Sequence, residues 1–191
     1  TFNDYDQAVD YAQEMIRFAN DKLAKNEKMR IPLNNDIPVL PINFRFVLDK
    51  TEENNYTGVF LRSEANPEIA YFIKTGPKRT QFSRKVFEKY KYREGEVINF
   101  MMMEHPIDSI NSPNCKASND GIGFPGWLKF TGAFQNLRDT VYRDDGTWYN
   151  QGAWSIVNIL LHEVGHTLGF THSWCKNDVC DDSPAHANSW F

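Results

Sequence analysis

The feature that most constrains this chain is the spacing of its histidines, because three of the five lie close together, at positions 162, 166 and 172. The residues around them carry an apolar stripe at three- and four-residue steps, which predicts a helix from about Gly152 to Leu168. Four residues advance a helix by about 400°, so His162 and His166 are expected on one face. Two imidazoles at that spacing can share one tetrahedral metal ion.

Glu163, Gly169 and His172 complete the pattern. Glu163 is expected to lie beside the two imidazoles and to reach a metal-bound water rather than the metal. Gly169 can end the helix in a left-handed turn, which brings His172 back toward the other histidines. Three neutral imidazoles with one open position are typical of a catalytic zinc site rather than a closed structural one. The alternative is that these are surface and core histidines of an ordinary amphipathic helix.

The rest of the chain predicts two further helices and several short strands. Helices are expected over residues 4–26 and roughly Arg79–Tyr92. The predicted strands are Ile42–Leu48, Gly58–Arg62, Ala70–Lys74, Val97–Met103 and Ile122–Phe124. Polar residues predict a loop over Asp139–Asn150. This order of elements indicates a mixed sheet packed by two or three helices, in the α/β (α+β) class.

Length and charge exclude several classes of function. The 191 residues suffice for one domain, and we expect residues 1–191 to form a single one. A net charge of -4 lacks the basic excess that is typical of nucleic-acid binding, so no nucleic-acid partner is expected. The chain has no apolar run of about 18 residues or more, so no membrane span is expected either.

The segment His162–His172 resembles the zinc signature of the metzincin clan of metallopeptidases, and it is most similar to the pappalysin family. Residues Leu161–His166 match that family's helix, and Asp178–Pro184 resembles its Asp-rich stretch, with Ser183 in place of Thr. The segment also resembles the matrixins, which are a close rival because they too have a serine after the third histidine, as Ser173 is here. The resemblance implies a metzincin-like twisted mixed sheet with an active-site helix at about 152–168.

The resemblance also implies a zinc-dependent endopeptidase acting on peptides or proteins. Zn²⁺ held by the three histidines would lower the pKa of a bound water from about 15.7 toward about 7. Glu163 would act as the general base and then donate the proton to the leaving amine. Two alternatives stay open: a catalytically weakened peptide- or metal-binding module of the same fold, and a metal hydrolase of small amides. The second does not predict Gly169 and His172.

Residues Gly121, Ile122, Gly123 and Phe124 weakly resemble the edge strand that receives substrate in the pappalysin family. An extended substrate is expected to pair with this edge by strand addition.

Metzincins carry a Met-containing turn after the third histidine, whereas all five methionines of this chain precede His172. Pappalysins also have a tyrosine near that turn, and the last tyrosine here is Tyr149. We therefore expect residues 1–169 to form an upper subdomain, and residues 170–191 to begin a short lower subdomain that is truncated. The competing explanation is that the protein departs from the clan.

The last twenty residues contain candidates for a second metal site and for a disulfide. Asp178, Asp181 and Asp182 can supply the oxygen ligands that Ca²⁺ prefers, and the alternative is a solvated acidic loop. Cys175 and Cys180 bridge each other, pair with cysteines of an absent tail as the resemblance suggests, or remain free thiols. A disulfide together with the resemblance predicts a secreted or cell-envelope enzyme.

Overall fold

The structure is a computed structural model that describes residues 4–28, 34, 36, 38–39, 41–72, 79–104, 120–131, 140–142, 148–150 and 153–172. Its helices are α1 (Tyr5–Lys25), η1 (Glu52–Asn54), α2 (Pro67–Ala70), α3 (Arg79–Tyr90), η2 (Ala153–Ile156) and α6 (Val157–Thr167). Its strands are β1 (Asn99–Met103), β2 (Asp120–Phe124), β3 (Trp127–Thr131), β4 (Thr140–Tyr142) and β5 (Trp148–Asn150). Among the described residues, no helix combines the length and the apolar character that crossing a membrane requires.

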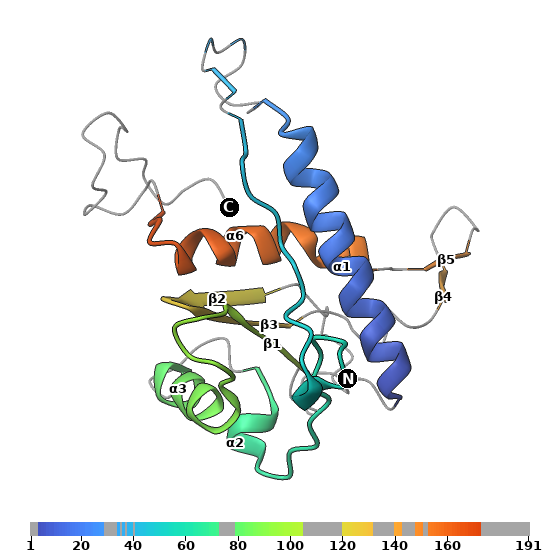
Figure 1. Cartoon of the computed structure of the whole chain (residues 1–191), viewed down its shortest axis with the longest axis vertical. Helices are drawn as coiled ribbons and strands as arrows, with labels where there is room; N and C mark the ends of the chain where they lie inside the picture. The colour runs from blue at the N-terminus through green and yellow to red at the C-terminus, as the bar shows by residue number, and fades with distance from the viewer. Residues whose placement is uncertain are drawn as a thin grey trace.

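The main sheet has the strand order β1-β3-β2, with β1 parallel and β2 antiparallel to β3. Figure 1 shows α1 and α6 on one side of this sheet and α2 and α3 on the other. Pro125 and Gly126 join β2 to β3 in a two-residue turn, in which Gly126 has a φ of +78°. Every residue of β3 is buried, because both faces of the sheet are covered. The helices and the small mixed sheet confirm the expected α+β class.

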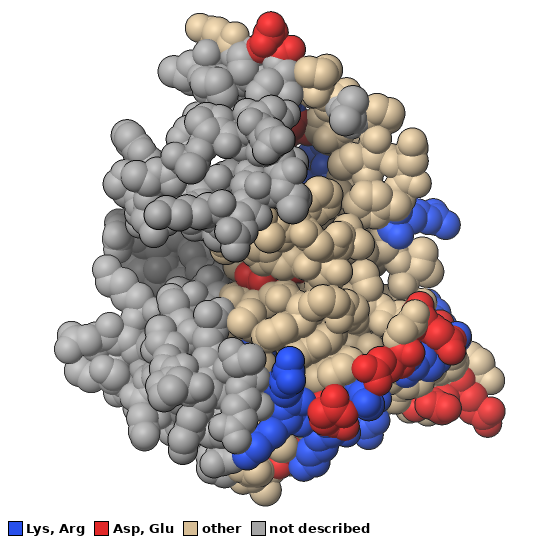
Figure 2. Space-filling model, turned by 90° about the vertical axis from the view of Figure 1, so that its left-hand side faces the viewer, with Lys and Arg blue, Asp and Glu red and all other residues tan. Residues whose placement is uncertain are grey.

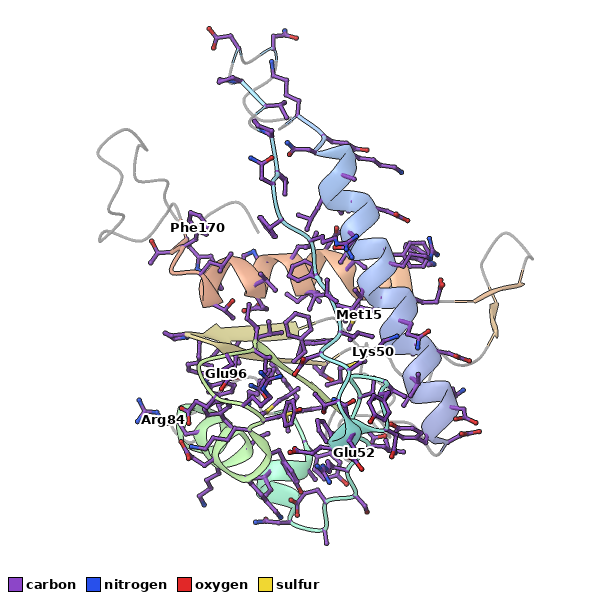
Figure 3. The ribbon with its side chains drawn as sticks, viewed as in Figure 1. Met15, Lys50, Glu52, Arg84, Glu96 and Phe170 are labelled. Atoms are coloured by element: carbon purple, nitrogen blue, oxygen red, sulfur yellow. The ribbon has the colours of Figure 1, made fainter. Side chains whose placement is uncertain are left out.

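The larger hydrophobic cluster lies between α1, α6 and one face of the sheet. Leu128 and Phe130 of β3 and Leu160 of α6 are fully buried in it, together with Met15 of α1. Figure 3 labels Met15 where α1 crosses α6. Burial of each such side chain contributes about 1.5–3 kcal/mol, so this cluster fixes the position of α6 against the sheet.

The smaller cluster lies on the opposite face of the sheet, beneath α2 and α3. It contains Ile69, Phe72, Val86 and Met103, with Met101 and Ile122 packed against them. Lys129 of β3 also belongs to this face and is only 1% exposed. Its Nζ lies 4.8 Å from the centre of the Phe72 ring, a cation–π contact that favours the buried ammonium group.

Glu64 anchors the extended segment before α2 to helix α3. Its carboxylate accepts hydrogen bonds from Lys89 Nζ and Tyr90 Oη, both at 2.5 Å, and from the backbone N–H of Asn66 at 2.8 Å. These donors, with Lys89 the strongest, lower the pKa of Glu64 to about 2. Figure 2 shows acidic and basic side chains interspersed at the level of α2 and α3.

Asn54 organises the loop between the two extended segments and is only 2% exposed. Its Nδ2 donates to the carbonyl of Asp49 at 2.7 Å, and its Oδ1 accepts from the backbone N–H groups of Thr51 and Gly58, both at 3.0 Å. Tyr5 of α1 docks on this loop, where its hydroxyl donates to the Asn54 carbonyl at 3.1 Å. The start of α1 is therefore tied to the loop.

Several predicted elements are confirmed. The helix expected over 4–26 is α1. At its start, Asp4 accepts a capping hydrogen bond from the N–H of Asp6, and at its end, Asn26 adopts the left-handed conformation. The helix expected at about 79–92 is α3, and the strands expected at 97–103 and 122–124 correspond to β1 and β2. The helix expected at about 152–168 begins as η2 and continues as α6.

The strands predicted over Ile42–Leu48 and Gly58–Arg62 are wrong, since neither segment forms a ladder. Side chains take up the backbone groups that a ladder needs. Asn20 donates to the carbonyl of Phe46 at 2.9 Å and accepts from its N–H at 2.8 Å. The carbonyl oxygen of Val59 lies 3.1 Å from Tyr5 Oη, whose single hydrogen it shares with the carbonyl of Asn54. The alternating pattern predicted an extended backbone correctly, but it did not identify the hydrogen-bond partners.

Three other predictions need correction. The strand predicted over Ala70–Lys74 does not form in the described residues. Ala70 ends α2, and Tyr71 forms only an isolated bridge with Glu104, while residues 73–74 lie outside the described part. The loop predicted over Asp139–Asn150 contains the antiparallel pair β4 and β5, because β-branched and aromatic residues flank its polar centre. Strand β3 was not predicted, although the Pro125-Gly126 pair signals a turn before it.

Candidate metal centre

The three histidines of the sequence pattern converge at the end of α6. The Nε2 atoms of His162 and His166 are 3.2 Å apart, and both lie close to Nε2 of His172, at 3.1 and 3.0 Å. His162 is exposed, whereas His166 and His172 are half-buried. The helix supplies two of the three candidate ligands and the segment after it supplies the third, which is the convergence that the spacing predicted.

The chain reverses after α6 through a glycine turn. The N–H of Gly169 donates to the carbonyl of His166, and the N–H of Phe170 donates to the carbonyl of Gly165, both at 3.0 Å. This pair of bonds is the Schellman motif, which places the residue after the helix in a left-handed conformation. Gly169 accordingly has a φ of +95°. The turn brings His172 back to the helix face that carries the other two histidines.

The same turn orients the imidazole of His166. Its Nδ1 lies 2.7 Å from the carbonyl oxygen of Phe170. A carbonyl oxygen can only accept, so Nδ1 carries the proton and, in the neutral ring, Nε2 carries the lone pair. Backbone acceptors of this kind commonly fix the tautomer of a metal-binding histidine. Figure 3 shows Phe170 directly after α6.

The three ring nitrogens fit a shared cation better than a set of hydrogen bonds. If Nε2 of His162 or of His172 carries a lone pair, that lone pair faces the lone pair of His166 Nε2. If both nitrogens carry hydrogens instead, those two hydrogens face each other, so at least one of the three contacts is always repulsive. The centre of the triangle lies about 1.8 Å from each nitrogen, and a zinc–imidazole bond is about 2.0–2.1 Å long. His162, His166 and His172 would hold a zinc ion through these nitrogens, and a set of three imidazole ligands would leave room for a water or a substrate atom as the fourth ligand.

The electrostatic environment favours the neutral form of His162 and His172. Although His162 as a whole is exposed, desolvation of its ring by the surrounding protein lowers its pKa, and the neighbouring His166 lowers it further. The pKa of His172 is lowered by burial first, then by His166 and His162. Neutral imidazole is the form that binds a metal ion, so both shifts favour binding near neutral pH.

Glu163 follows His162 in α6 and is buried, with 4% of its surface exposed. Its side chain packs against the backbone of β2 at Gly121, on the side of the sheet that faces α6. A carboxylate one residue away from a candidate metal ligand is a candidate group to accept and return a proton. The described arrangement therefore combines a fitting set of metal ligands with an acid–base group.

The predicted substrate residues Gly121–Phe124 all lie in β2, which pairs with β3 along one side and forms an edge of the described sheet. Gly121 and Gly123 face α6, whereas Ile122 packs against the smaller cluster. The ring of Phe124 stacks on Trp127 at 4.2 Å between centroids.

The remaining predicted site residues lie outside the described part. These are Asp178, Asp181 and Asp182 of the calcium prediction and Cys175 and Cys180 of the disulfide prediction. The sequence reasoning missed the carbonyl of Phe170, for which a backbone group gives no signal. It also missed the contact of Gly121 and Gly123 with α6. Two glycines at alternate positions of a strand are a signal of close backbone approach.

Comparison with models of known protein families gave no match, and neither did comparison with curated proteins or with solved structures.

Proposed function

We propose that this chain is a zinc-dependent endopeptidase, with His162, His166 and His172 as the zinc ligands. The observation that carries the proposal is the convergence of three Nε2 atoms within 3.0–3.2 Å of one another, at the end of a helix that also carries the buried Glu163 directly after His162. The resemblance of this segment to the metzincin signature supports the same conclusion. A pappalysin-like assignment, a matrixin-like one as second choice, and a secreted or cell-envelope location belong to this proposal.

Peptide hydrolysis needs an electrophile for the carbonyl and a group that moves a proton. Zn²⁺ bound at the triad supplies a Lewis acid and lowers the pKa of water toward neutrality. Glu163 takes a proton from the attacking water at its carboxylate and delivers it to the nitrogen of the leaving amine. The hydrogen bond from His166 Nδ1 to the Phe170 carbonyl holds that imidazole in the ligating orientation throughout.

The edge strand β2 is the proposed substrate-binding element. Its pairing with β3 uses one side of the strand, and an extended peptide can add along the other side by backbone hydrogen bonds. Because β2 crosses α6 at Glu163 and His166, a peptide paired there would run past the triad. The proposed substrate class is therefore an extended, unstructured peptide segment. Ca²⁺ at Asp178, Asp181 and Asp182 stays a separate proposal.

The experiment measures zinc content and cleavage of an unfolded protein substrate, with and without a zinc chelator. Glu163→Gln should retain the zinc and lose about 10²–10⁴-fold in kcat, because it keeps the shape of the side chain and removes the base. Glu53→Gln, which changes an exposed glutamate of η1, is the matched control and should leave the rate unchanged.

Three outcomes would contradict parts of the proposal. A chain that binds no zinc would exclude the metal centre. A chain that binds zinc and cleaves nothing would favour the peptide- or metal-binding module. Full activity in Glu163→Gln would exclude Glu163 as the base.

A further inference from the structure

Strand β2 meets helix α6 through glycines alone on the face that they share. Gly121 and Gly123 alternate with Ile122, so both point to the same side of the sheet. They pair with Phe130 and Leu128 of β3, which are fully buried against α6. On this face of β2, backbone rather than side chain therefore contacts the helix that carries the proposed zinc ligands.

The space above Gly121 is filled by the side chain of Glu163. A Cβ atom at position 121 would lie 2.4 Å from Glu163 Cγ, 2.7 Å from its Oε1 and 2.8 Å from its Cδ. These distances are far shorter than the 3.5–4.0 Å or so of favourable contacts between carbon atoms. Glu163 is only 4% exposed, so the carboxylate is confined by its surroundings. A methyl group at 121 would displace the carboxylate itself.

The space above Gly123 is filled by the backbone of α6. A Cβ atom at position 123 would lie 2.4 Å from the carbonyl oxygen of Glu163 and 2.7 Å from Cβ of His166. Neither atom can move by a simple side-chain rotation, because one is backbone and the other is attached directly to it. A methyl group at 123 would therefore push the helix away from the sheet and carry His166 with it.

We propose that Gly121 and Gly123 are positioning residues with separate tasks in the proposed reaction. Gly121 sets the position of the Glu163 carboxylate, and Gly123 sets the distance of α6 from β2 and thereby the position of His166 in the triad. This inference rests on the proposed function, which gives the carboxylate and the imidazole different roles. It predicts that the same substitution, glycine to alanine, has different effects at two positions of one strand.

The first experiment measures zinc affinity, kcat and KM for Gly121→Ala and Gly123→Ala. Gly121→Ala should lower kcat by about 100-fold, and it should leave KM and zinc affinity within about twofold of the unsubstituted protein. Gly123→Ala should weaken zinc binding by about tenfold or more, since second-sphere support of a ligand is lost. Gly165→Ala is the matched control, because apart from its two chain neighbours and the surrounding backbone of α6, no described atom lies within 4 Å of a Cβ at that position.

The second experiment needs no catalysis and uses urea unfolding of the zinc-free protein. Gly121→Ala should lower the urea midpoint, and most of that loss should disappear in a Glu163→Ala background, since that change removes all three atoms near position 121. An equal loss in both backgrounds would overturn the role of Gly121. Equal weakening of zinc binding by both glycine substitutions would overturn the division of tasks.

Failure of the proposed function is distinguishable from failure of this inference. If the unsubstituted protein cleaves no peptide, the endopeptidase proposal fails. The zinc affinities and the urea midpoints of the single and double variants still test whether Gly121 positions Glu163 and whether Gly123 positions His166. If the Gly123→Ala chain does not fold, the result supports the tight approach of β2 and α6. The comparison of Gly121→Ala in the unsubstituted and Glu163→Ala backgrounds then tests the division of tasks.

Discussion

Replacing Gly169 with alanine should weaken zinc binding while leaving the rest of the fold intact. Gly169 has a φ of +95°, in the region where an L side chain meets the following carbonyl. The turn at Gly169 places both the Phe170 carbonyl, which orients His166, and the return path to His172. Strain at this single residue therefore affects two of the three proposed zinc ligands, His166 and His172.

The expected size of the effect follows from the backbone strain. A non-glycine residue in the left-handed region costs about 1–2 kcal/mol. Leu168 and Phe170 are 55% and 69% exposed, so few contacts hold the turn in the zinc-free protein and it can relax there. Zinc binding restores the turn, and the strain then opposes binding. Because about 1.4 kcal/mol corresponds to tenfold in affinity, the zinc dissociation constant should rise by about 5–30-fold.

The assay is competition for zinc with a chromophoric chelator, combined with urea unfolding of the zinc-free protein. Gly169→Ala should lose affinity with little change in the urea midpoint, and Gly169→Asn should lose less, because asparagine enters the left-handed region more readily. Gly165→Ala, which changes a helical glycine without a positive φ, is the control. Unchanged zinc affinity in Gly169→Ala would refute the coupling between the turn and the triad.

Two further predictions concern the scaffold. The pKa of Glu64 is lowered to about 2 in the folded chain, so its contribution to stability is complete above its ordinary pKa of 4.5 and is lost as the pH falls toward 2. The difference in urea midpoint between the unsubstituted protein and Glu64→Gln should shrink over that range, and a constant difference would contradict the assignment. Asn54→Ala should lower the free energy of unfolding by about 3 kcal/mol, because it leaves the partly buried backbone groups at Asp49, Thr51 and Gly58 without their partner. A loss below about 0.5 kcal/mol in denaturant titration would show that water replaces the amide.

The parts of the fold that could be predicted from the sequence are those determined by local patterns. The apolar stripe and the capping residue Asp4 define α1, and the apolar run before Glu104 defines β1. The histidine spacing together with Gly169 predicted both the helix and the turn, because a helix repeat and a positive φ are local properties.

The parts that could not be predicted depend on distant partners. The alternation in residues 42–48 is compatible with a ladder, and only the tertiary position of Asn20 shows that a side-chain amide binds Phe46 instead. The sequence of β3 does not look like a buried strand, because it contains Lys129 and lysine is rarely buried. In the fold, Lys129 is buried with the Phe72 ring as a compensating contact, and that contact cannot be predicted from the sequence. The role of the Phe170 carbonyl could not be read from residue types, because every residue has a carbonyl group.

The glycine pair of β2 has a consequence for folding fidelity. Hairpins can mispair, and a shift of one residue between β2 and β3 would exchange the two faces of the strand. Ile122 would then stand where Gly121 or Gly123 meets α6, at a point where even a single added carbon comes within 2.4 Å of the helix. A misregistered hairpin could not accept the helix at this distance. Helix α6 can therefore pack against the sheet only when β2 and β3 pair in the native register. Metal binding at the proposed site would then report that the chain is correctly folded.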